Sequence, residues 1–118
     1  MKHYALILAT LLSLLIPVQG WGDNRQKGWD AYQSGDYATA LKEWTPLAEE
    51  GDADLQHNVG IIYLLGLGVP NNFTTAAKWL GLAADQGDPR AQFNLGQMYG
   101  RGDGVPQDFR KQVELYTL

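Results

Sequence analysis

The sequence contains no cysteine, and its only histidines are His3 and His57. Without cysteine the chain has no disulfide, no thiolate nucleophile and no site for the lipid anchor of a lipoprotein. His57 has no second histidine or cysteine at the spacing that zinc sites require. Packing of the chain must therefore hold the fold together, and proteins built on disulfides or structural zinc are excluded.

Basic residues are also scarce, with 9 Lys and Arg against 13 Asp and Glu, which gives a net charge of −4. Residues 1–20 contain Lys2 and no acid, so the rest of the chain is more acidic still. Nucleic-acid binding needs a basic stripe, and docking on anionic lipid needs a basic patch. We therefore expect no nucleic-acid partner, and the scattered acids are typical of a solvated surface.

The amino terminus has the pattern of a secretory signal peptide. Lys2 precedes an apolar run over residues 4–16, and Val18 and Gly20 fit the positions before a cleavage site. The run is shorter than the roughly 20 residues of a membrane span. These features predict a signal peptide over residues 1–20, cleaved near Gly20, with no stable membrane span afterwards. An uncleaved amino-terminal anchor is the alternative.

The remainder of the chain is a repeat with a period of 36 residues, which is in the range of helical solenoids. Residues 52–87 form one complete copy, and residues 88–118 repeat its loop residues, its helix-end residues and its small residues. The identical pairs are Asp52 and Asp88, Gln56 and Gln92, Asn58 and Asn94, Gly60 and Gly96, Tyr63 and Tyr99, Gly66 and Gly102, Gly68 and Gly104, Val69 and Val105, Pro70 and Pro106, and Phe73 and Phe109.

Apolar residues three and four apart, separated by glycine, proline and aspartate, predict an all-helical chain. The predicted helices cover residues 25–33, 37–50, 53–65, 73–86 and 90–99, and a last helix begins near residue 108. Asp23 or Asn24 is expected to cap the first helix. Pro46 lies inside the second helix and predicts a kink or break near Trp44.

Gly60 and Gly96 fall in the middle of predicted helices, where glycine costs about 1 kcal/mol relative to alanine. Because two copies have this destabilising glycine at the same position, we infer that close packing of helices requires it there. We expect the first helix of each repeat to approach the second closely there, at Ala76 or its equivalent.

These motifs resemble the Sel1-like repeat family (SLR), a branch of the tetratricopeptide repeat (TPR) solenoids. The resemblance is carried by residues 91–99 (Ala-Gln-Phe-Asn-Leu-Gly-Gln-Met-Tyr) and residues 102–109 (Gly-Asp-Gly-Val-Pro-Gln-Asp-Phe). Residues 76–80 and 83–87 add the matching small and aromatic positions of the second helix. The resemblance implies a right-handed α-solenoid of about 2.5–3 repeats over residues 21–118, with repeats near 24–51, 52–87 and 88–118.

The outer copies depart from the complete one. The first copy lacks the extended Gly-x-Gly-Val-Pro loop and resembles a short TPR-like capping repeat. In the third copy Gln112 replaces Ala76 and Leu115 replaces Trp79, so the last helix is expected to pack less tightly. Solenoid ends usually need a polar cap, which this helix lacks. Its apolar residues are therefore expected either to fray or to be covered by a partner or second subunit.

No catalytic, metal or cofactor site is predicted. His57 takes the position of Phe93 in the next copy, so packing explains it better than catalysis or metal binding. Asp52 and Asp54 are expected to cap and to complement the helix dipole. Ser34 lies in a turn, with no histidine at a recognisable spacing. The glycine pairs at Gly66 and Gly102 follow helices, which disfavours a phosphate cradle.

Solenoids of the resembled family bind along the concave face, which the first helix of each repeat lines. Polar and aromatic residues on those helices are the candidate partner-binding residues: Gln56, Asn58, Tyr63, Gln92, Asn94 and Tyr99. Stacked amides could bind an extended peptide or a sugar. The equal alternative is that Asn58 and Asn94 form hydrogen bonds between helices of the same repeat.

The sequence thus favours a non-enzymatic protein–protein interaction module, an adaptor or scaffold of bacterial type, periplasmic or secreted. The first alternative is an envelope component that binds peptidoglycan or exopolysaccharide. A weak β-lactam hydrolase is less favoured, because the disulfides of such relatives and a nucleophile–base pair are both lacking here.

Overall fold

The computed structural model describes residues 22–118, so the predicted signal peptide lies outside the described residues. Within them the chain forms six helices and no strand. A first helix covers residues 22–33, and the others are α2 (Tyr37–Glu49), α3 (Ala53–Leu65), α4 (Phe73–Asp85), α5 (Pro89–Arg101) and α6 (Phe109–Tyr116). The predicted all-α fold is confirmed.

Asparagine and aspartate fix where the helices begin. The side chain before each labelled helix accepts a hydrogen bond from a backbone N–H of the first turn, and such a cap contributes about 1 kcal/mol. The five N-caps are Asp36, Asp52, Asn72, Asp88 and Asp108. The predicted capping role of Asp52 is therefore confirmed, and Asp88 has the same role one repeat later.

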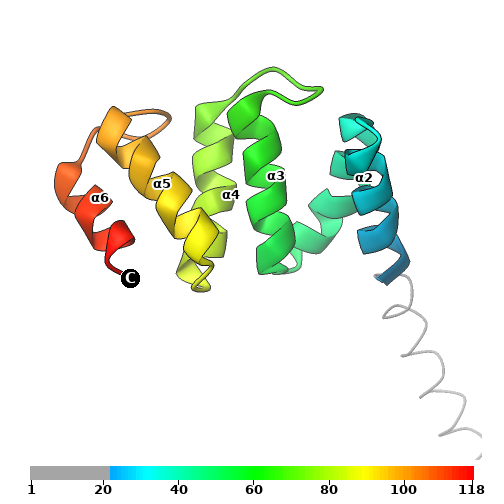
Figure 1. Cartoon of the computed structure of the whole chain (residues 1–118), viewed down its shortest axis with the longest axis horizontal. Coiled ribbons are helices and arrows are strands. Elements are labelled where there is room, and N and C mark those ends of the chain that lie inside the picture. Colours follow the sequence, from blue (N-terminus) through cyan, green and yellow to red (C-terminus); the bar gives the residue numbers. More distant parts are fainter. Residues whose placement is uncertain (1–21) are drawn as a thin grey trace, which may run out of the picture.

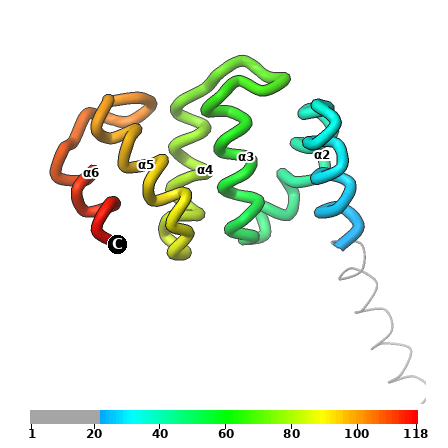
Figure 2. The backbone as a smooth tube through the Cα atoms, viewed as in Figure 1, coloured from blue at the N-terminus to red at the C-terminus, as the bar shows by residue number. Residues whose placement is uncertain are grey.

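The helices stand side by side as three successive pairs (Figure 1). We call the first helix, α3 and α5 the A helices, and α2, α4 and α6 the B helices. The long loops that join A to B within the second and third repeats lie at one edge of the row (Figure 2). The short turns that lead from one repeat to the next lie at the opposite edge. This is the layout of a solenoid.

The core consists of two apolar clusters that each span the junction between repeats. The first joins the first helix and α2 to α3 and includes Trp44, Val59 and Ile62. The second joins α4 to α5 and α6 and includes Leu80 and Leu95. Full burial of one such aliphatic side chain stabilises the fold by roughly 1.5–3 kcal/mol. Successive repeats therefore share their cores, in addition to the packing of the two helices within each repeat.

The expected close approach at the mid-helix glycines occurs, but one turn further along the B helix than Ala76. A Cβ on Gly60 would lie 2.8 Å from a side-chain carbon of Leu80, and a Cβ on Gly96 would lie 2.7 Å from Tyr116. Gly28 makes the same approach to the ring of Trp44. Because Trp44, Leu80 and Tyr116 occupy the same repeat position, Gly28 aligns with Gly60 and Gly96.

The helices differ from the prediction mainly at three points, and their other ends agree to within one residue. Residues 23 and 24 are already helical, so neither caps the first helix. The helix α2 runs unbroken through Pro46, and the carbonyl one turn earlier belongs to the exposed Lys42, where water can reach it. The helix α5 ends at Arg101 and not at Tyr99, because Gly102 adopts the left-handed capping conformation, as Gly66 does after α3.

The last helix buries only Leu115. Gln112 takes the place of Ala76, and a compensating change makes room for it. Gly100 occupies the position of Leu64, and a Cβ on Gly100 would lie 2.3 Å from Gln112 Nε2. In the second repeat the small residue of this helix–helix contact is Ala76 on the B helix, whereas in the third repeat it is Gly100 on the A helix.

Candidate functional site

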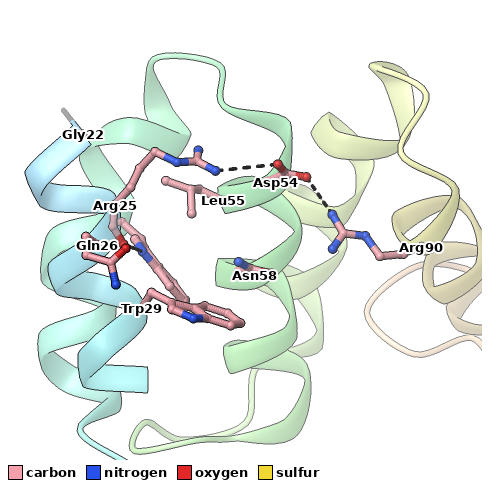
Figure 3. Close-up of a pocket in the computed structure, with 9 residues that line it drawn as sticks. Gly22, Arg25, Gln26, Trp29, Asp54, Leu55, Asn58 and Arg90 are labelled. Carbon is pink, nitrogen blue, oxygen red and sulfur yellow. Dashed lines mark hydrogen bonds and ion pairs between the residues drawn. The ribbon is translucent and has the colours of Figure 1, made fainter. Parts of the chain in front are cut away.

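A groove of about 530 Å³ opens on the face formed by the A helices, between the first helix and α3 (Figure 3). The first helix contributes Arg25, Gln26 and Trp29 to its wall. Opposite them lie Asp54, Leu55 and Asn58 of α3, with Arg90 of α5 beyond. The groove is therefore lined mainly by the first two repeats, with Arg90 of the third repeat at its edge.

A chain of ion pairs links the three A helices along this groove. Arg25 Nη1 pairs with Asp52, and Arg25 Nη2 lies 3.7 Å from Asp54 Oδ2. Arg90 Nη2 donates to Asp54 Oδ1 at 2.8 Å and to Asp88 Oδ2 at 2.8 Å. Asp54 thus lies between two guanidinium groups, one from each neighbouring repeat. Since most of these groups are substantially exposed, each pair contributes at most about 1 kcal/mol to stability.

Asp88 is the buried member of the chain, with a side chain only 6% exposed. The hydrogen bond from the Arg90 side chain holds the pKa of Asp88 below its ordinary value, and it raises the pKa of Arg90 in turn. Both groups therefore stay charged at neutral pH. The same carboxylate accepts from the backbone N–H of Arg90 and Ala91, so it fixes both the helix start and the arginine.

Trp29 supplies the apolar surface of the groove. It is 44% exposed, although it stacks on Tyr32 with ring centroids 5.8 Å apart and planes 9° apart. Trp44 supports the pair from beneath, 6.2 Å from Trp29 and 5.6 Å from Tyr32. The three rings make a rigid aromatic platform, and rigid exposed tryptophans are typical anchors in binding sites.

A second groove, of about 370 Å³, lies between α3 and α5. Ile61, Leu64 and Leu65 of α3 form one side, and Asn94 and Arg101 of α5 lie on the other. Asn94 thus stands beside α3 as Asn58 stands beside the first helix. The A-helix face therefore carries two successive grooves, each with the repeated asparagine at its side.

His57 lies next to the first groove, in a small cleft with Trp29, Tyr32, Asn58 and Ile61. Its Nδ1 is 3.2 Å from the amide oxygen of Asn58. Partial burial lowers the pKa of His57 below its ordinary value, because the cleft disfavours the charged imidazolium. The neutral ring therefore predominates at neutral pH.

We expect His57 to make the folded protein less stable under mildly acidic conditions. Because its pKa is lower in the folded than in the unfolded state, the unfolded state binds more protons as the pH falls through about 6.5. The free energy of unfolding should therefore decrease from pH 7.5 to pH 5.5, by a small amount since the ring is partly exposed. Urea denaturation at both pH values measures it. The same decrease in His57→Gln would contradict the assignment.

A model of the Sel1 repeat matches residues 53–88 and 89–118, which together are more than half of the chain. The chain belongs to the Sel1 repeat family. Proteins of this family generally mediate protein–protein interactions.

Two solved structures support the same assignment. A protective antigen of uropathogenic Escherichia coli strains, which displays an SLR fold, is 31% identical with a TM-score of 0.76, over 82% of this chain and 22% of the antigen. A Sel1 repeat protein from Oxalobacter formigenes is 32% identical with a TM-score of 0.73, over 78% of this chain and 38% of that chain. The chain thus spans between a fifth and two fifths of these relatives. A search of curated proteins found no match.

Two of the six predicted partner-binding residues are used inside the Sel1 repeats. Gln56 is 4% exposed, donates to the carbonyl oxygen of Ala48 at 3.0 Å and accepts from Gln86 at 2.9 Å. Gln92 donates to the carbonyl oxygen of Ala84 at 3.3 Å, which is the same contact one repeat later. These glutamines fasten the end of each B helix to the next A helix, so we leave them out of the proposed surface.

The other four predicted residues divide into two classes. Asn58 and Asn94 are half-buried and line the grooves. Among residues 22–118 the Asn58 amide oxygen is within hydrogen-bond distance of its neighbour His57 and forms no hydrogen bond to a second helix. Tyr63 and Tyr99 are also half-buried, but their rings pack against the core clusters. The asparagines are thus the more accessible members of the predicted set.

Sequence reasoning missed Arg25, Trp29 and Arg90, and it gave Asp54 only a helix-end role. Trp29 is 44% exposed and Phe93 is 52% exposed, so aromatic residues of the A helices contribute to the surface. The alignment of the repeats does contain a signal for the ion pair between Asp54 and Arg90. Asp54 and Arg90 occupy the same position of successive repeats, and equal positions lie side by side in a solenoid, so an acid followed by a base predicts an ion pair.

No helix of residues 22–118 is long and apolar enough to cross a membrane. No group of three or more histidine, aspartate or glutamate side chains there could hold a metal ion.

Proposed function

We propose that this Sel1 repeat protein is an adaptor that binds an extended segment of a partner protein along its A-helix face. The observation that carries the proposal is the groove beside Trp29, where a rigid exposed indole faces Asn58 and the Arg25–Asp54–Arg90 ion pairs. Interaction sites typically combine an aromatic anchor with a rim of polar groups. The second groove at Asn94 continues this surface into the next repeat.

We also propose that the protein acts outside the cytoplasm of a bacterium, in the periplasm or as a secreted protein. Support comes from the sequence of residues 1–20, with Lys2, the apolar run and the small residues at Val18 and Gly20. The bacterial sources of the two similar structures agree with a bacterial origin.

Site-specific photo-crosslinking in the producing cell tests the face directly. A photoreactive amino acid in place of Asn58 or Asn94 should give covalent adducts with one defined partner protein. The same amino acid in place of Lys78, an exposed residue of the B helix α4, is the matched control. Equal adducts at Lys78, or none at either asparagine, would contradict the A-helix assignment.

Once that partner is identified, substitutions measure how much the A-helix face contributes to the binding affinity. We expect Asn58→Ala and Asn94→Ala together to weaken binding at least about tenfold. Both amides border the grooves, and removing an amide leaves a polar group of the bound partner buried without its hydrogen bond. Calorimetry measures the affinity, and unchanged binding in the double variant would refute the proposal.

A glycan of the cell envelope is the second candidate ligand. One observation favours it, which is the flat exposed face of Trp29 next to the carboxylate of Asp54 and the amides of Gln26 and Asn58. Sugars present both apolar faces and hydroxyls, so such a surface suits them. Retention of the protein on immobilised peptidoglycan, lost in Trp29→Ala, would favour this ligand over a protein segment.

A further inference from the structure

Acceptor groups are already occupied in the first groove, which lies between the first helix and α3. The two oxygens of Asp54 lie 3.7 Å and 2.8 Å from the guanidinium groups of Arg25 and Arg90. The amide oxygen of Asn58 lies 3.2 Å from His57 Nδ1. Because an amide oxygen can only accept, this ring nitrogen donates to it. Little acceptor capacity is therefore left for a ligand.

Donor groups remain available in the same groove. Among residues 22–118 the amide nitrogen of Asn58 and the indole nitrogen of Trp29 donate to no other group, and both side chains line the groove (Figure 3). Arg90 uses its Nε and Nη2 in bonds to aspartates and keeps its Nη1. Against these donors stands the amide oxygen of Gln26. The groove therefore suits a ligand that offers several acceptors and few donors.

The charges around this groove disfavour a charged ligand of either sign. The ion-pair chain contains two arginines and three aspartates, and the whole protein has a net charge of −4, which disfavours an acidic segment. A basic segment would meet the guanidinium groups of Arg25 and Arg90, whose side chains are 43% and 52% exposed. The ligand is therefore expected to be uncharged as well as rich in acceptors.

Three hollows join into one path across the A helices. Trp29 and Asn58 line both the first groove and the His57 cleft, which has a volume of about 140 Å³. Ile61 lines both this cleft and the second groove, where Asn94 lies. The cleft is smaller than the roughly 300–1,000 Å³ of pockets that hold drug-sized ligands, so it suits a single side chain. Two aromatic rings and Ile61 form its walls, so that side chain is expected to be apolar.

We propose that the partner segment is an uncharged, proline-containing stretch in the polyproline II conformation, a proposal that rests on the proposed function of the A-helix face. A polyproline II helix forms no internal hydrogen bonds, so its carbonyl oxygens can accept from Trp29, Asn58 and Asn94. Proline has no backbone N–H, so such a segment brings few donors into a groove that has few acceptors. A proline ring fills the His57 cleft, since aromatic-lined grooves are typical binding sites for this conformation.

Titration with a synthetic peptide tests the recognition of this conformation. The probe is a peptide of about ten prolines, roughly 31 Å long as a polyproline II helix, and a Gly-Ser peptide of equal length is the control. The proline peptide should bind at least about tenfold more tightly, because it is already ordered before binding. It should also shift the indole N–H resonance of Trp29 in a ¹H–¹⁵N spectrum, which is assigned by its loss in Trp29→Phe. Equal binding of both peptides, or an unshifted resonance, would overturn the proposal.

Asn58→Asp tests the donor directly. The new side chain has nearly the same shape but offers only acceptors, so the affinity for the proline peptide should fall at least about tenfold. Lys78→Gln, on the exposed surface of α4, changes the net charge by the same amount and is the matched control, which should keep the original affinity. Equal losses in both variants would contradict the donor role of Asn58.

Salt dependence and photo-crosslinking separate this proposal from the proposed function. Because the segment is uncharged, its affinity should change less than about twofold between about 50 and 500 mM sodium chloride. Mass spectrometry of the adduct formed at Asn58 identifies the crosslinked segment of the natural partner. A proline-containing segment without net charge supports both proposals. A charged segment, or one without proline, would overturn the polyproline II proposal and leave the A-helix face as the binding surface.

Discussion

Replacing Trp44 with alanine is expected to cost about 3–5 kcal/mol of stability, the usual range for a fully buried large aromatic residue. Trp44 is 1% exposed and belongs to the first core cluster, which joins the first two repeats. Its Nε1 donates to the carbonyl oxygen of Arg25 at 3.1 Å, and its ring contacts the backbone at Gly28. Since small domains have only about 5–15 kcal/mol of stability, such a loss could unfold the first repeat.

Trp29→Ala is the matched control for this prediction. Trp29 touches the same aromatic group but is 44% exposed, so its removal leaves little cavity and should cost about 1 kcal/mol. Urea denaturation followed by far-UV circular dichroism measures both variants without relying on tryptophan fluorescence. Trp44→Phe should fall between them, since it keeps an aromatic ring and loses the hydrogen bond. Equal losses from Trp29 and Trp44 would contradict the assigned packing.

The two variants also separate stability from the proposed function. Trp29→Ala should impair binding while the fold persists, because the exposed ring borders the groove. Trp44→Ala should impair both, because Trp44 supports Trp29 from the core side. Binding that is lost only together with the fold would argue against Trp29 as an anchor.

The helices could be predicted from sequence because their boundaries depend on local chemistry. Asp52 and Gly66 bound α3 through a side-chain cap and a left-handed glycine, and both effects act within one turn. The error at the end of α5 was avoidable, since Gly102 repeats Gly66. The unbroken helix at Pro46 could not be predicted from the sequence, because a helix tolerates a proline only where the carbonyl one turn earlier can bind water instead.

The site was harder to predict because it depends on how repeats face each other. Gln56 and Asn58 are both polar residues two positions apart on α3, yet one is used inside the solenoid and the other borders a groove. The difference is that the carbonyl oxygen of Ala48, in the preceding B helix, lies within reach of Gln56, and this contact is known only from the structure. The exposure of Trp29 likewise depends on how two repeats face each other, because its ring borders the groove between the first helix and α3.

Alanine at Gly104 is expected to destabilise the protein by about 3 kcal/mol, since it adds two separate penalties. Gly104 has φ +69°, a conformation that residues with a Cβ rarely adopt. The added Cβ would also lie 2.4 Å from the carbonyl carbon and oxygen of Phe73, at the start of α4. Backbone atoms cannot move aside as a flexible side chain can, so the loop of the third repeat must shift away from α4.

Two other glycines separate these penalties. Gly87 has φ +90° with nothing within 4 Å of its added Cβ, so Gly87→Ala should show only the conformational cost of about 1–2 kcal/mol. Gly81 lies inside α4 with equally open space and no positive φ, so Gly81→Ala should stabilise by about 0.5–1 kcal/mol. Urea denaturation of the three variants gives the order. If Gly104→Ala costs no more than Gly87→Ala, the loop does not rest on α4. A larger cost would mean that loop contacts as well as buried side chains join successive repeats, as Gly68 over Tyr37 of α2 also indicates.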